Sequence, residues 1–422
     1  MRSAAIGLCL VLCIAVGTAS ALDPVQVTDD DWFNYMPSLI ERQDGGRMIV
    51  YERLDPSTLY GDLLVTFSED GTDWTEPELI VSGPSNERHP ALVQLPDGAY
   101  FLYYLSDSTG NYKIHHAVSQ DGFAWELRGP VDLGWDNEPL VNPTVCLEPD
   151  GSLTMTYDRL SVGGYIAHSL DGLIWDTDRT AVSDGPINRI MRHSDGTYVL
   201  SFQRRTGPNY YQIDIFTKTS PDRVNWSAET RVTVTQNSHD SFPIELADGR
   251  YGLFYATSTG GQPYELFSRT SPDGASWTDE EEWFPYAGWD TQPHPVLLRN
   301  GSLALAWPRG PTQLTTEVFY AEVMDPAGVS ILPRGERHPI SAYPNPARGE
   351  VRLDLAGRDE ARAVVTIFDA SGRLCRTLVA LPGSGAIAWD RKDRAGRPVS
   401  PGIYFFRLDD RSAARGRVTL ID

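Results

Sequence analysis

The stretch Ser68-Glu69-Asp70-Gly71-Thr72-Asp73-Trp74 decides how this chain folds, because its Ser-x-Asp-x-x-x-Trp frame occurs five times. The frame returns at Ser119, Ser169, Ser220 and Ser271, at steps of 51, 50, 51 and 51 residues. Spacing this regular indicates an internal repeat, and repeats of about 20–50 residues are typical of solenoids, propellers and arrays.

The residue types of the frame predict a tight turn. Glycine tolerates a positive φ, and an aspartate carboxylate accepts hydrogen bonds from turn amides that no strand satisfies. We expect the tryptophan to fold back and bury its ring on its own sheet. The frame is therefore interpreted as a structural turn that contacts no ligand. The side chains assigned to it are Ser68, Asp70, Trp74, Ser119, Asp121, Trp125, Ser169, Asp171, Trp175, Ser220, Asp222, Trp226, Ser271, Asp273 and Trp277.

Short apolar runs around the Asp-Gly and Asn-Gly turns predict strands. In the first repeat these runs are residues 37–40, 48–51 and 63–67, and a fourth run follows the Ser-Asp-Trp frame at residues 78–81. Four short antiparallel strands in each repeat of about 50 residues are typical of a propeller blade.

The hairpins outnumber the Ser-Asp-Trp frames by one. The last unit begins at Pro293 and ends after a third strand near residues 317–323, whereas residues 25–28 stand alone before the first unit. Those residues can supply the missing outer strand and so remove an open sheet edge. We therefore predict an all-β chain in which residues 22–330 form a six-bladed β-propeller that is closed by its own N-terminal strand.

The first residues predict export. Arg2 precedes an apolar run at residues 4–16, and Ala19-Ser20-Ala21 fits a signal-peptidase frame. The run is too short to span a membrane, so residues 1–21 are predicted to be a cleaved signal peptide, and no other segment predicts a transmembrane helix. The mature protein is expected to be secreted or attached to the cell surface. Its two remaining cysteines, Cys146 and Cys375, fall in different predicted domains, so no disulfide is expected.

Charge is distributed unevenly along the chain. Residues 336–422 hold 15 Lys and Arg against 11 Asp and Glu, whereas residues 1–335 hold 21 against 46. An acidic main domain argues against nucleic acid and anionic membranes as partners. It still permits a glycan or another anionic small ligand, provided that arginines gather locally.

The five in-phase turns resemble the Asp-box repeats of the sialidase superfamily over residues 22–330. The first repeat is similar beyond its turn, because Tyr51-Glu52-Arg53 is followed by a loop that contains Asp55 and Asp62. The resemblance implies a propeller whose ligand chemistry lies at one end of a central channel. Blade topology brings candidate binding residues to that end, and they are Tyr35, Arg53, Arg88, Arg159, Arg189, Arg204, His239 and His294. These arginines either converge on an anion or pair with neighbouring acids on a solvated surface.

The sequence departs from the sialidase pattern at two positions. That pattern implies three arginines on the substrate carboxylate, a Tyr-Glu nucleophile pair and an aspartic acid/base. Tyr35 stands where the first arginine is expected, and the last repeat begins with Gln292-Pro293-His294-Pro295, which lacks the nucleophilic tyrosine. An ordinary exo-sialidase is therefore not expected.

Other carboxylate pairs could still cleave a glycosidic bond, which requires two acids about 5–10 Å apart. The candidates are Asp62 or Asp55 together with Asp158 or Asp240, and the alternative is that all four are solvated loop acids. The sequence favours a divergent glycoside hydrolase, and a non-catalytic glycan-binding or structural surface propeller is the alternative. No cofactor or catalytic metal is predicted, and a structural cation stays open.

A second domain is predicted at residues 339–422, after a linker at residues 331–338. Its apolar positions alternate as in strands, and it contains Tyr343-Pro344-Asn345-Pro346 and Ser400-Pro401-Gly402-Ile403-Tyr404. These motifs resemble Ig-like C-terminal domains of the hook-capping type and the sorting domains of type IX secretion. The resemblance implies a small Ig-like β-sandwich whose partner is a secretion machine.

Overall fold

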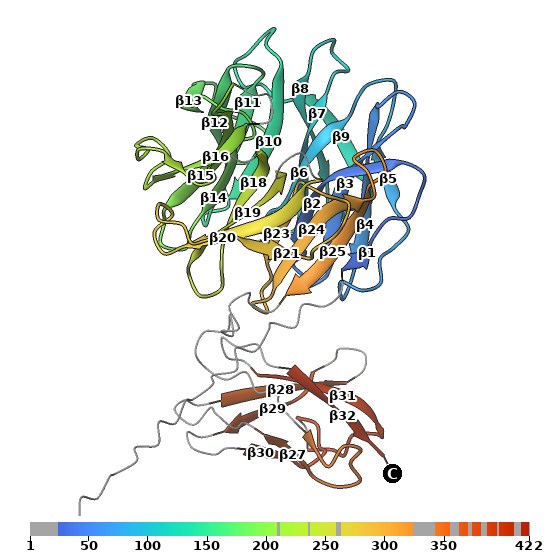
Figure 1. Cartoon of the computed structure of the whole chain (residues 1–422). Helices are drawn as coiled ribbons and strands as arrows, with labels where there is room; N and C mark the ends of the chain where they lie inside the picture. Colours follow the sequence, from blue (N-terminus) through green and yellow to red (C-terminus); the bar gives the residue numbers. More distant parts are fainter. Residues whose placement is uncertain are drawn as a thin grey trace, which may run out of the picture. The chain divides into compact units, whose positions relative to one another are not determined.

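The computed structural model of the chain (Figure 1) describes residues 24–208, 212–234, 237–258, 263–323, 342–354, 363–369, 374–380, 386–394, 396–408 and 415–421. Within these ranges every regular element is a β-strand, from β1 (Val25–Gln26) to β32 (Arg415–Leu420), so the all-β prediction is confirmed. The predicted signal peptide and the predicted linker lie outside the described residues. The chain divides into two compact units, Met1–Ile331 and Leu332–Asp422.

Unit 1 begins with three separate four-stranded sheets, each made of consecutive antiparallel strands. The first contains β2 (Phe33–Glu41), β3 (Arg47–Leu54), β4 (Gly61–Ser68) and β5 (Glu78–Val81). The second contains β6 (Arg88–Gln94), β7 (Tyr100–Ser106), β8 (Lys113–Ser119) and β9 (Trp125–Pro130). The third contains β10 (Leu140–Leu147), β11 (Leu153–Arg159), β12 (Gly163–Ser169) and β13 (Thr180–Ser183).

An eight-stranded sheet follows and holds two further sets of consecutive strands. The first set is β14 (Arg189–Arg192), β15 (Tyr198–Arg205), β16 (Ile213–Ser220) and β17 (Thr230–Arg231). The second set is β18 (Asn237–Glu245), β19 (Tyr251–Ser258), β20 (Glu265–Ser271) and β21 (Glu281–Trp283). The sets are joined where Ile213 pairs in parallel with Asn237.

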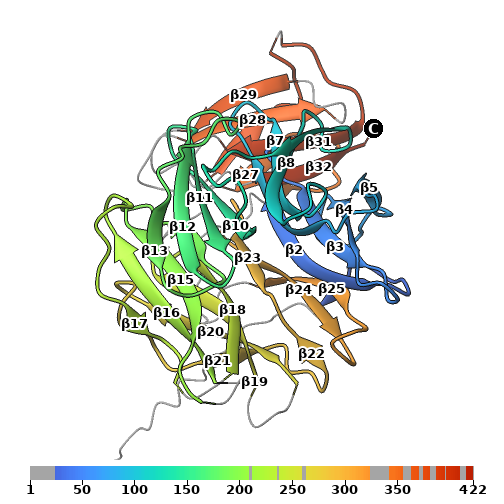
Figure 2. The ribbon, with the colours of Figure 1, turned by 90° about the horizontal axis from the view of Figure 1, so that it is seen from above.

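The last sheet of unit 1 connects the beginning of the unit to its end. It contains β22 (Trp289–Asp290), β23 (His294–Leu297), β24 (Leu303–Gly310), β25 (Glu317–Val323) and the N-terminal strand β1. Val25 lies opposite Tyr320 and Gln26 opposite Phe319, so the predicted pairing of the N-terminal strand with the third strand of the last hairpin group is confirmed. Seen from above, the sheets of unit 1 follow one another around a centre toward which β2, β10, β18 and β23 lie (Figure 2).

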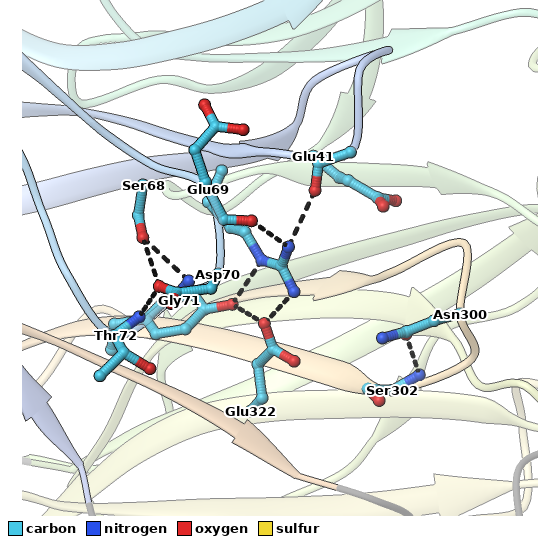
Figure 3. A network of polar contacts seen from close by, with 12 residues as sticks. Glu41, Ser68, Glu69, Asp70, Gly71, Thr72, Asn300, Ser302 and Glu322 are labelled. Carbon is cyan, nitrogen blue, oxygen red and sulfur yellow. Dashed lines mark hydrogen bonds and ion pairs between the residues drawn. The ribbon is translucent and has the colours of Figure 1, made fainter. Parts of the chain in front are cut away.

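The Ser-Asp-Trp frames form turns that satisfy their own amides. In the first frame, Gly71 N donates to Ser68 Oγ at 2.8 Å and Thr72 N donates to Asp70 Oδ1 at 2.8 Å (Figure 3). In the same way, an aspartate of each other frame accepts bonds from the amides two and three residues later, at Asp121, Asp171, Asp222 and Asp273. These carboxylates stabilise the turns because they cap amides that have no strand partner.

The tryptophans of the frames also link neighbouring sheets. Trp175 is 5% exposed, and its ring lies 5.4 Å edge-on from Tyr103 of the preceding sheet. Trp74 contacts Tyr320 of the last sheet in a similar way, at 5.1 Å. These two rings therefore pack against the preceding sheet in addition to their own, a contact that the repeat pattern does not predict.

Unit 2 consists of two antiparallel sheets that share one core. One sheet contains β26 (Ala342–Tyr343), β27 (Val351–Asp354) and β30 (Ala386–Trp389). The other contains β29 (Leu374–Ala380), β28 (Ala363–Asp369), β31 (Gly402–Leu408) and β32. Leu353 and Trp389 of the first sheet pack with Ile367, Phe406 and Val418 of the second, and all five are buried.

No helix in the described part of the chain has the length and apolarity needed to cross a membrane.

Candidate functional site

A channel of about 560 Å³ runs through unit 1. It is lined by β2, β6, β10, β14, β18 and β23, which we call the inner strands because each is the innermost strand of its group. Most of the wall is apolar. Polar side chains gather at both ends of the channel. Those where the inner strands begin are His89, Arg189, Asp240, Gln292 and His294, and those at the opposite end are Glu41, Gln43, Gln94, Arg192 and Arg299. Since the inner strands occupy the same place in each repeat, the residues where they begin meet at one end, which we call the channel mouth.

The chain adopts the same unusual backbone conformation at the start of every inner strand. One residue in each has a positive φ, and these residues are Met36 (46°), His89 (51°), Asn142 (55°), Ile187 (58°), Asp240 (55°) and Gln292 (48°). Four of them fall at register shifts within the inner strand, which are bulges that redirect side chains. The mouth is therefore built by a strained ring of residues that arises from the repeat.

Side chains of neighbouring strand groups hold this ring in place. Glu52 accepts a hydrogen bond from His89 N at 2.8 Å, and Gln203 accepts one from Asp240 N at 3.0 Å. Asp158 accepts bonds from Ile187 N at 2.7 Å, from Asn142 Nδ2 at 2.7 Å and from Asn188 Nδ2 at 2.6 Å. Asp158 thus has a structural position in which its oxygens are occupied.

The two buried acids of this group differ in their electrostatics. Burial raises the pKa of Asp158, and the hydrogen bonds from Asn142 and Asn188 offset that effect only in part. Burial also opposes ionisation of Glu52, but the charge of Arg88 and the bond from His89 hold the pKa of Glu52 below its ordinary value. Arg88 Nη2 lies 2.9 Å from Glu52 Oε1. Both acids therefore orient the mouth without offering a free carboxylate to it.

Three predicted binding arginines are held between an aromatic ring and an acid. Arg53 lies over Trp32 at 4.7 Å and 3.9 Å from Asp62. Arg159 lies over Trp135 at 4.9 Å and 3.0 Å from Glu138, and Arg204 lies over Phe216 at 4.2 Å and 2.7 Å from Asp184. None of the three lines the channel. They are arranged as cation–π and ion-pair contacts that fix the rim.

Arg189 differs from these arginines because no acid lies within ion-pair distance of it in the described residues. Its Nη1 donates to Thr144 Oγ1 at 2.9 Å and lies 3.5 Å from the Asn142 carbonyl oxygen. Burial lowers the pKa of Arg189, although the charges of Asp240 and Asp158 act in the opposite direction. An arginine remains protonated in proteins, so a partly buried guanidinium lines the channel at its mouth.

Asp240 is the free acid of the channel mouth. Its carboxylate receives no hydrogen bond from a described residue, and it makes no ion pair with Arg189 within 4.0 Å. Burial raises the pKa of Asp240, while the charges of His239 and Arg189 lower it. Asp240 and Arg189 are therefore opposite charges at one mouth, and neither is saturated by the other.

Two uncharged histidines complete the mouth. Burial lowers the pKa of His89 to about 4 and that of His294 to about 3. His294 Nδ1 accepts a bond from Leu39 N at 3.3 Å, which assigns the proton of the neutral ring to Nε2. His89 Nδ1 is buried and has no hydrogen-bond partner. Both rings can exchange neutral hydrogen bonds with a ligand.

The remaining predicted residues lie elsewhere. Asp55 caps its own loop, where it accepts bonds from Ser57 N at 2.7 Å and Thr58 N at 3.0 Å. The Tyr35 hydroxyl donates to the Gln313 carbonyl, and burial raises the pKa of Tyr35 to about 12. His239 bonds Gln203 at 3.1 Å and Asn237 at 2.8 Å.

Of the predicted site residues, the structure brings Arg189, Asp240 and His294 to the channel wall. The sequence pattern did not single out His89 as a binding residue, although His89 also lines the channel. An alignment of the repeats could have found it, because His89 precedes Pro90 as Asn142 precedes Pro143 and Gln292 precedes Pro293. Among the described residues, no group of three or more His, Cys, Asp or Glu side chains is arranged to hold a metal ion.

Solved structures with the same fold include enzymes of carbohydrate metabolism. A protein of unknown function from Dyadobacter fermentans is 18% identical, with 72% of this chain and 99% of that chain covered and a TM-score of 0.60. An α-L-arabinanase from Penicillium chrysogenum, complexed with arabinobiose, is 18% identical over 73% and 99% of the chains, with a TM-score of 0.55. The NanB sialidase from Streptococcus pneumoniae is 13% identical over 71% and 70%, with a TM-score of 0.56.

These similarities show that the chain has a sialidase-like propeller fold. No protein-family model and no curated protein matches the chain.

Proposed function

We propose that unit 1 is a carbohydrate-active propeller that binds an anionic saccharide at the channel mouth. The observation that carries this proposal is Arg189, a partly buried guanidinium with no acid of the described residues within ion-pair distance. Leaving a buried charge without a counter-charge is costly, and a carboxylate on the ligand would supply both charge and paired hydrogen bonds. The other predicted binding arginines already have such partners.

The rest of the mouth suits a sugar. His89, Gln292 and His294 offer neutral hydrogen-bonding groups, and Phe242, whose ring lies 4.4 Å from that of His294, offers an apolar face. Sugar sites combine such faces with a few convergent polar groups. The fold supports the same ligand class, since solved structures that share it include a sialidase and an arabinanase bound to arabinobiose.

The geometry supports binding better than turnover. Glycoside hydrolysis uses two carboxyl groups on opposite sides of the scissile bond, and Asp240 is the one acid at the channel mouth whose oxygens are unoccupied among the described residues. Glu52 and Asp158 are committed to the backbone. Hydrolysis with Asp240 as general acid is the second candidate, and the raised pKa of Asp240 favours it.

A glycan array probed with the full-length protein tests this proposal, provided that both retention and released product are scored. We expect retention of glycans that carry a carboxylate and loss of retention in the Arg189→Gln variant. Arg204→Gln is the matched control, because it removes the same charge from an arginine that pairs with Asp184 outside the channel. Product release that disappears in Asp240→Asn would select hydrolysis, and retention that is unchanged in Arg189→Gln would refute the site.

We further propose that unit 1 has six blades. Each set of consecutive strands would be one blade, so the eight-stranded sheet would hold two. The single parallel pair between Ile213 and Asn237 supports this division, because it joins the sets at only one residue pair.

We also propose that unit 2 is an Ig-like sorting domain and that the protein is secreted or surface-attached. The support is its two antiparallel sheets around one core, the sequence motifs of residues 339–422 and the signal-like residues 1–21. Its partner would be a secretion machine that reads the folded tail.

A further inference from the structure

A second cavity, of about 390 Å³, lies beside the turn of the fourth Ser-Asp-Trp frame and apart from the channel mouth. Its wall includes Glu148, His168, Arg192, Tyr198 and Arg223. These residues come from the third sheet and from the strand set that begins with β14, so the cavity lies at the seam between two repeats.

Arg223 is an exception within the repeat. It occupies the position that is glycine in the other four frames, namely Gly71, Gly122, Gly172 and Gly274. Arg223 nevertheless keeps a left-handed backbone, with a φ of 68°. Such a conformation is strained for a residue with a Cβ atom, and strain of this kind is found at functional sites more often than elsewhere.

Two neighbouring positions depart from the repeat at the same seam. A Cβ atom on Gly172 would lie 2.8 Å from the side chain of Phe101. At Arg223, the residue in the repeat position of Phe101 is Thr154, whose smaller side chain leaves space for the arginine. Glu148 is the one acid at a turn position that is leucine in three of the described repeats and Arg42 or His193 in two others, and it is 7% exposed. A buried carboxylate requires polar partners around it.

The three exceptional residues contact one another. Arg223 Nη1 donates to Thr154 Oγ1 at 2.8 Å, and Thr154 Oγ1 donates to Glu148 Oε1 at 2.5 Å. Tyr198 also donates to Glu148, at 2.8 Å. The three residues that depart from the repeat therefore belong to one connected set of hydrogen bonds.

Two guanidinium groups share the single carboxylate of Glu148. Arg192 Nε lies 3.3 Å and Arg223 Nη1 lies 3.8 Å from Glu148 oxygens. Both guanidinium groups lie over the Tyr198 ring, at 5.7 Å and 5.6 Å. By contrast, Arg47 at the seam between the first and last sheets forms an ion pair with a carboxylate of its own, that of Glu322.

One positive charge of this pair is left uncompensated by Glu148. The other acid on the wall, Asp150, caps its own hairpin turn through Ser152 N at 3.0 Å and Ser152 Oγ at 2.6 Å. The Nε and Nη2 groups of Arg223 make no hydrogen bond to a described residue. His168 adds a ring nitrogen 3.0 Å from Ser152 Oγ.

From this arrangement we infer a second ligand site, which binds a small tetrahedral oxyanion, namely phosphate or sulfate, free or as a monoester. Arginine forks match the geometry of such groups, and the two forks here approach from different elements, β14 and the turn of the fourth frame. Arg192 also lines the channel, but the site shares neither Arg189 nor Asp240 with the saccharide site at the channel mouth.

Isothermal titration calorimetry of the full-length protein tests the inference, with sodium phosphate and glucose 6-phosphate as probes and chloride used to hold the ionic strength constant. We expect saturable binding that weakens at least tenfold in Arg223→Gly. This variant restores the residue of the other four frames and should fold with an unchanged or raised melting temperature, because the backbone strain is removed. Binding of both probes would show that the site also accepts a phosphate monoester, and binding of sodium phosphate alone would restrict the site to the free ion.

Two further variants keep the test decisive if Arg223→Gly folds poorly. Arg192→Gln should weaken binding by a similar factor, and Glu148→Leu should tighten it, because the carboxylate that competes with the ligand is gone. Arg204→Gln is the charge-matched control and should bind like the native protein. Absence of saturable binding in the native protein, or equal affinity in Arg223→Gly, would overturn the inference and leave Arg223 as a packing contact between repeats.

Discussion

At the scale of single residues, Asp158 and Asp240 show how two acids near the channel mouth take opposite roles. Asp158 accepts hydrogen bonds from Asn142, Ile187 and Asn188, whereas the carboxylate of Asp240 accepts none from a described residue. Burial raises the pKa of both. The difference between them is therefore the set of donors, which the sequence places on other strands.

Replacing each acid by asparagine should change stability in opposite directions. A carboxyl group whose pKa is raised on folding destabilises the folded state once the group ionises. The free energy of unfolding therefore begins to fall as the pH rises past the pKa of the unfolded chain, near 3.8, and it stops falling above the pKa of the folded protein. Asp240→Asn should therefore raise the melting temperature at pH 7 and have little effect below pH ~4. Asp158→Asn should destabilise by about 1–3 kcal/mol, because an amide NH₂ would face existing donors.

Thermal unfolding of both variants at pH 7 and at pH ~3.5 checks this pair. Destabilisation by Asp240→Asn at pH 7 would mean that its carboxylate has a partner, and the channel mouth would then lose its free acid.

The histidines of the mouth predict acid sensitivity. The pKa values of His89 and His294, about 4 and about 3, lie below the ordinary value of 6.5. The unfolded chain therefore binds protons below pH 6.5 that the folded chain does not, and stability falls as pH drops from 6.5 toward 4. Each histidine contributes a slope of up to about 1.4 kcal/mol per pH unit.

Urea unfolding of the native protein and of His294→Gln between pH 6.5 and 4.5 measures that slope. Glutamine keeps an acceptor for Leu39 N but does not titrate, so the variant should show the shallower dependence. Identical slopes would show that His294 is protonated as readily in the folded protein as in the unfolded chain.

At the scale of elements, the Ser-Asp-Trp turn joins sheets as well as strands. Trp175 is 5% exposed and contacts Tyr103 of the preceding sheet. Trp175→Ala should therefore destabilise the protein by about 3–5 kcal/mol. The adjacent Ile174 is 76% exposed, and Ile174→Ala is the control, with an expected change within about 0.5 kcal/mol. Equal unfolding midpoints in denaturant for the two variants would show that the ring contributes nothing to the seam.

Periodicity predicts contacts within a repeat better than contacts between repeats. The strands, the turns and the pairing of residues 25 and 26 with β25 follow from spacing, turn chemistry and hairpin count. The contact between Trp175 and Tyr103 crosses from one sheet to the next, and no spacing rule reports it.

The candidate site was predictable only in part, for the same reason. The sequence placed Arg189, Asp240 and His294 at one end of the channel, which they do line. It placed Arg53, Arg159 and Arg204 there too, and left open whether those three bind an anion or pair with neighbouring acids. Their aromatic and acidic partners lie on separate segments, as Trp32 does for Arg53 and Asp184 does for Arg204. Whether an arginine is free thus depends on contacts that appear only once the sheets are assembled.

At the scale of the whole molecule, the parts of the chain before and after residue 336 carry opposite net charge. Residues 336–422 carry an excess of four positive charges, whereas residues 1–335 carry an excess of 25 negative charges, as 21 Lys and Arg stand against 46 Asp and Glu. The field of the main unit repels an approaching anion. Recognition of an anionic sugar therefore depends on the local charge of Arg189 inside the channel, where screening by salt is weaker.

The tail should be separable from the propeller. Unit 2 has its own buried core around Trp389, so deletion of residues 339–422 is expected to leave a folded propeller. We predict that this truncated form crosses the inner membrane but accumulates in the periplasm, whereas the full-length form reaches the surface or the medium. Fractionation of cells that express each form measures this, and equal surface amounts would show that the tail is a spacer without a sorting role.

Whether Arg189 binds a carboxylate is tested most directly by a calorimetric cycle that combines a change of Arg189 with a change of the ligand. Native protein and Arg189→Gln are each titrated with glycosides of glucuronic acid and N-acetylneuraminic acid, and with the methyl esters of the same glycosides. We predict that, for at least one acid, esterification weakens binding to the native protein by about 1.5–3 kcal/mol, as expected for hydrogen bonds to a charged group. Esterification should have almost no effect on the variant, since Arg189 is gone. Two results would contradict the proposal that Arg189 binds a carboxylate. One is that the native protein binds each acid and its methyl ester with equal affinity, and the other is that Arg189→Gln weakens the binding of acid and ester by the same factor.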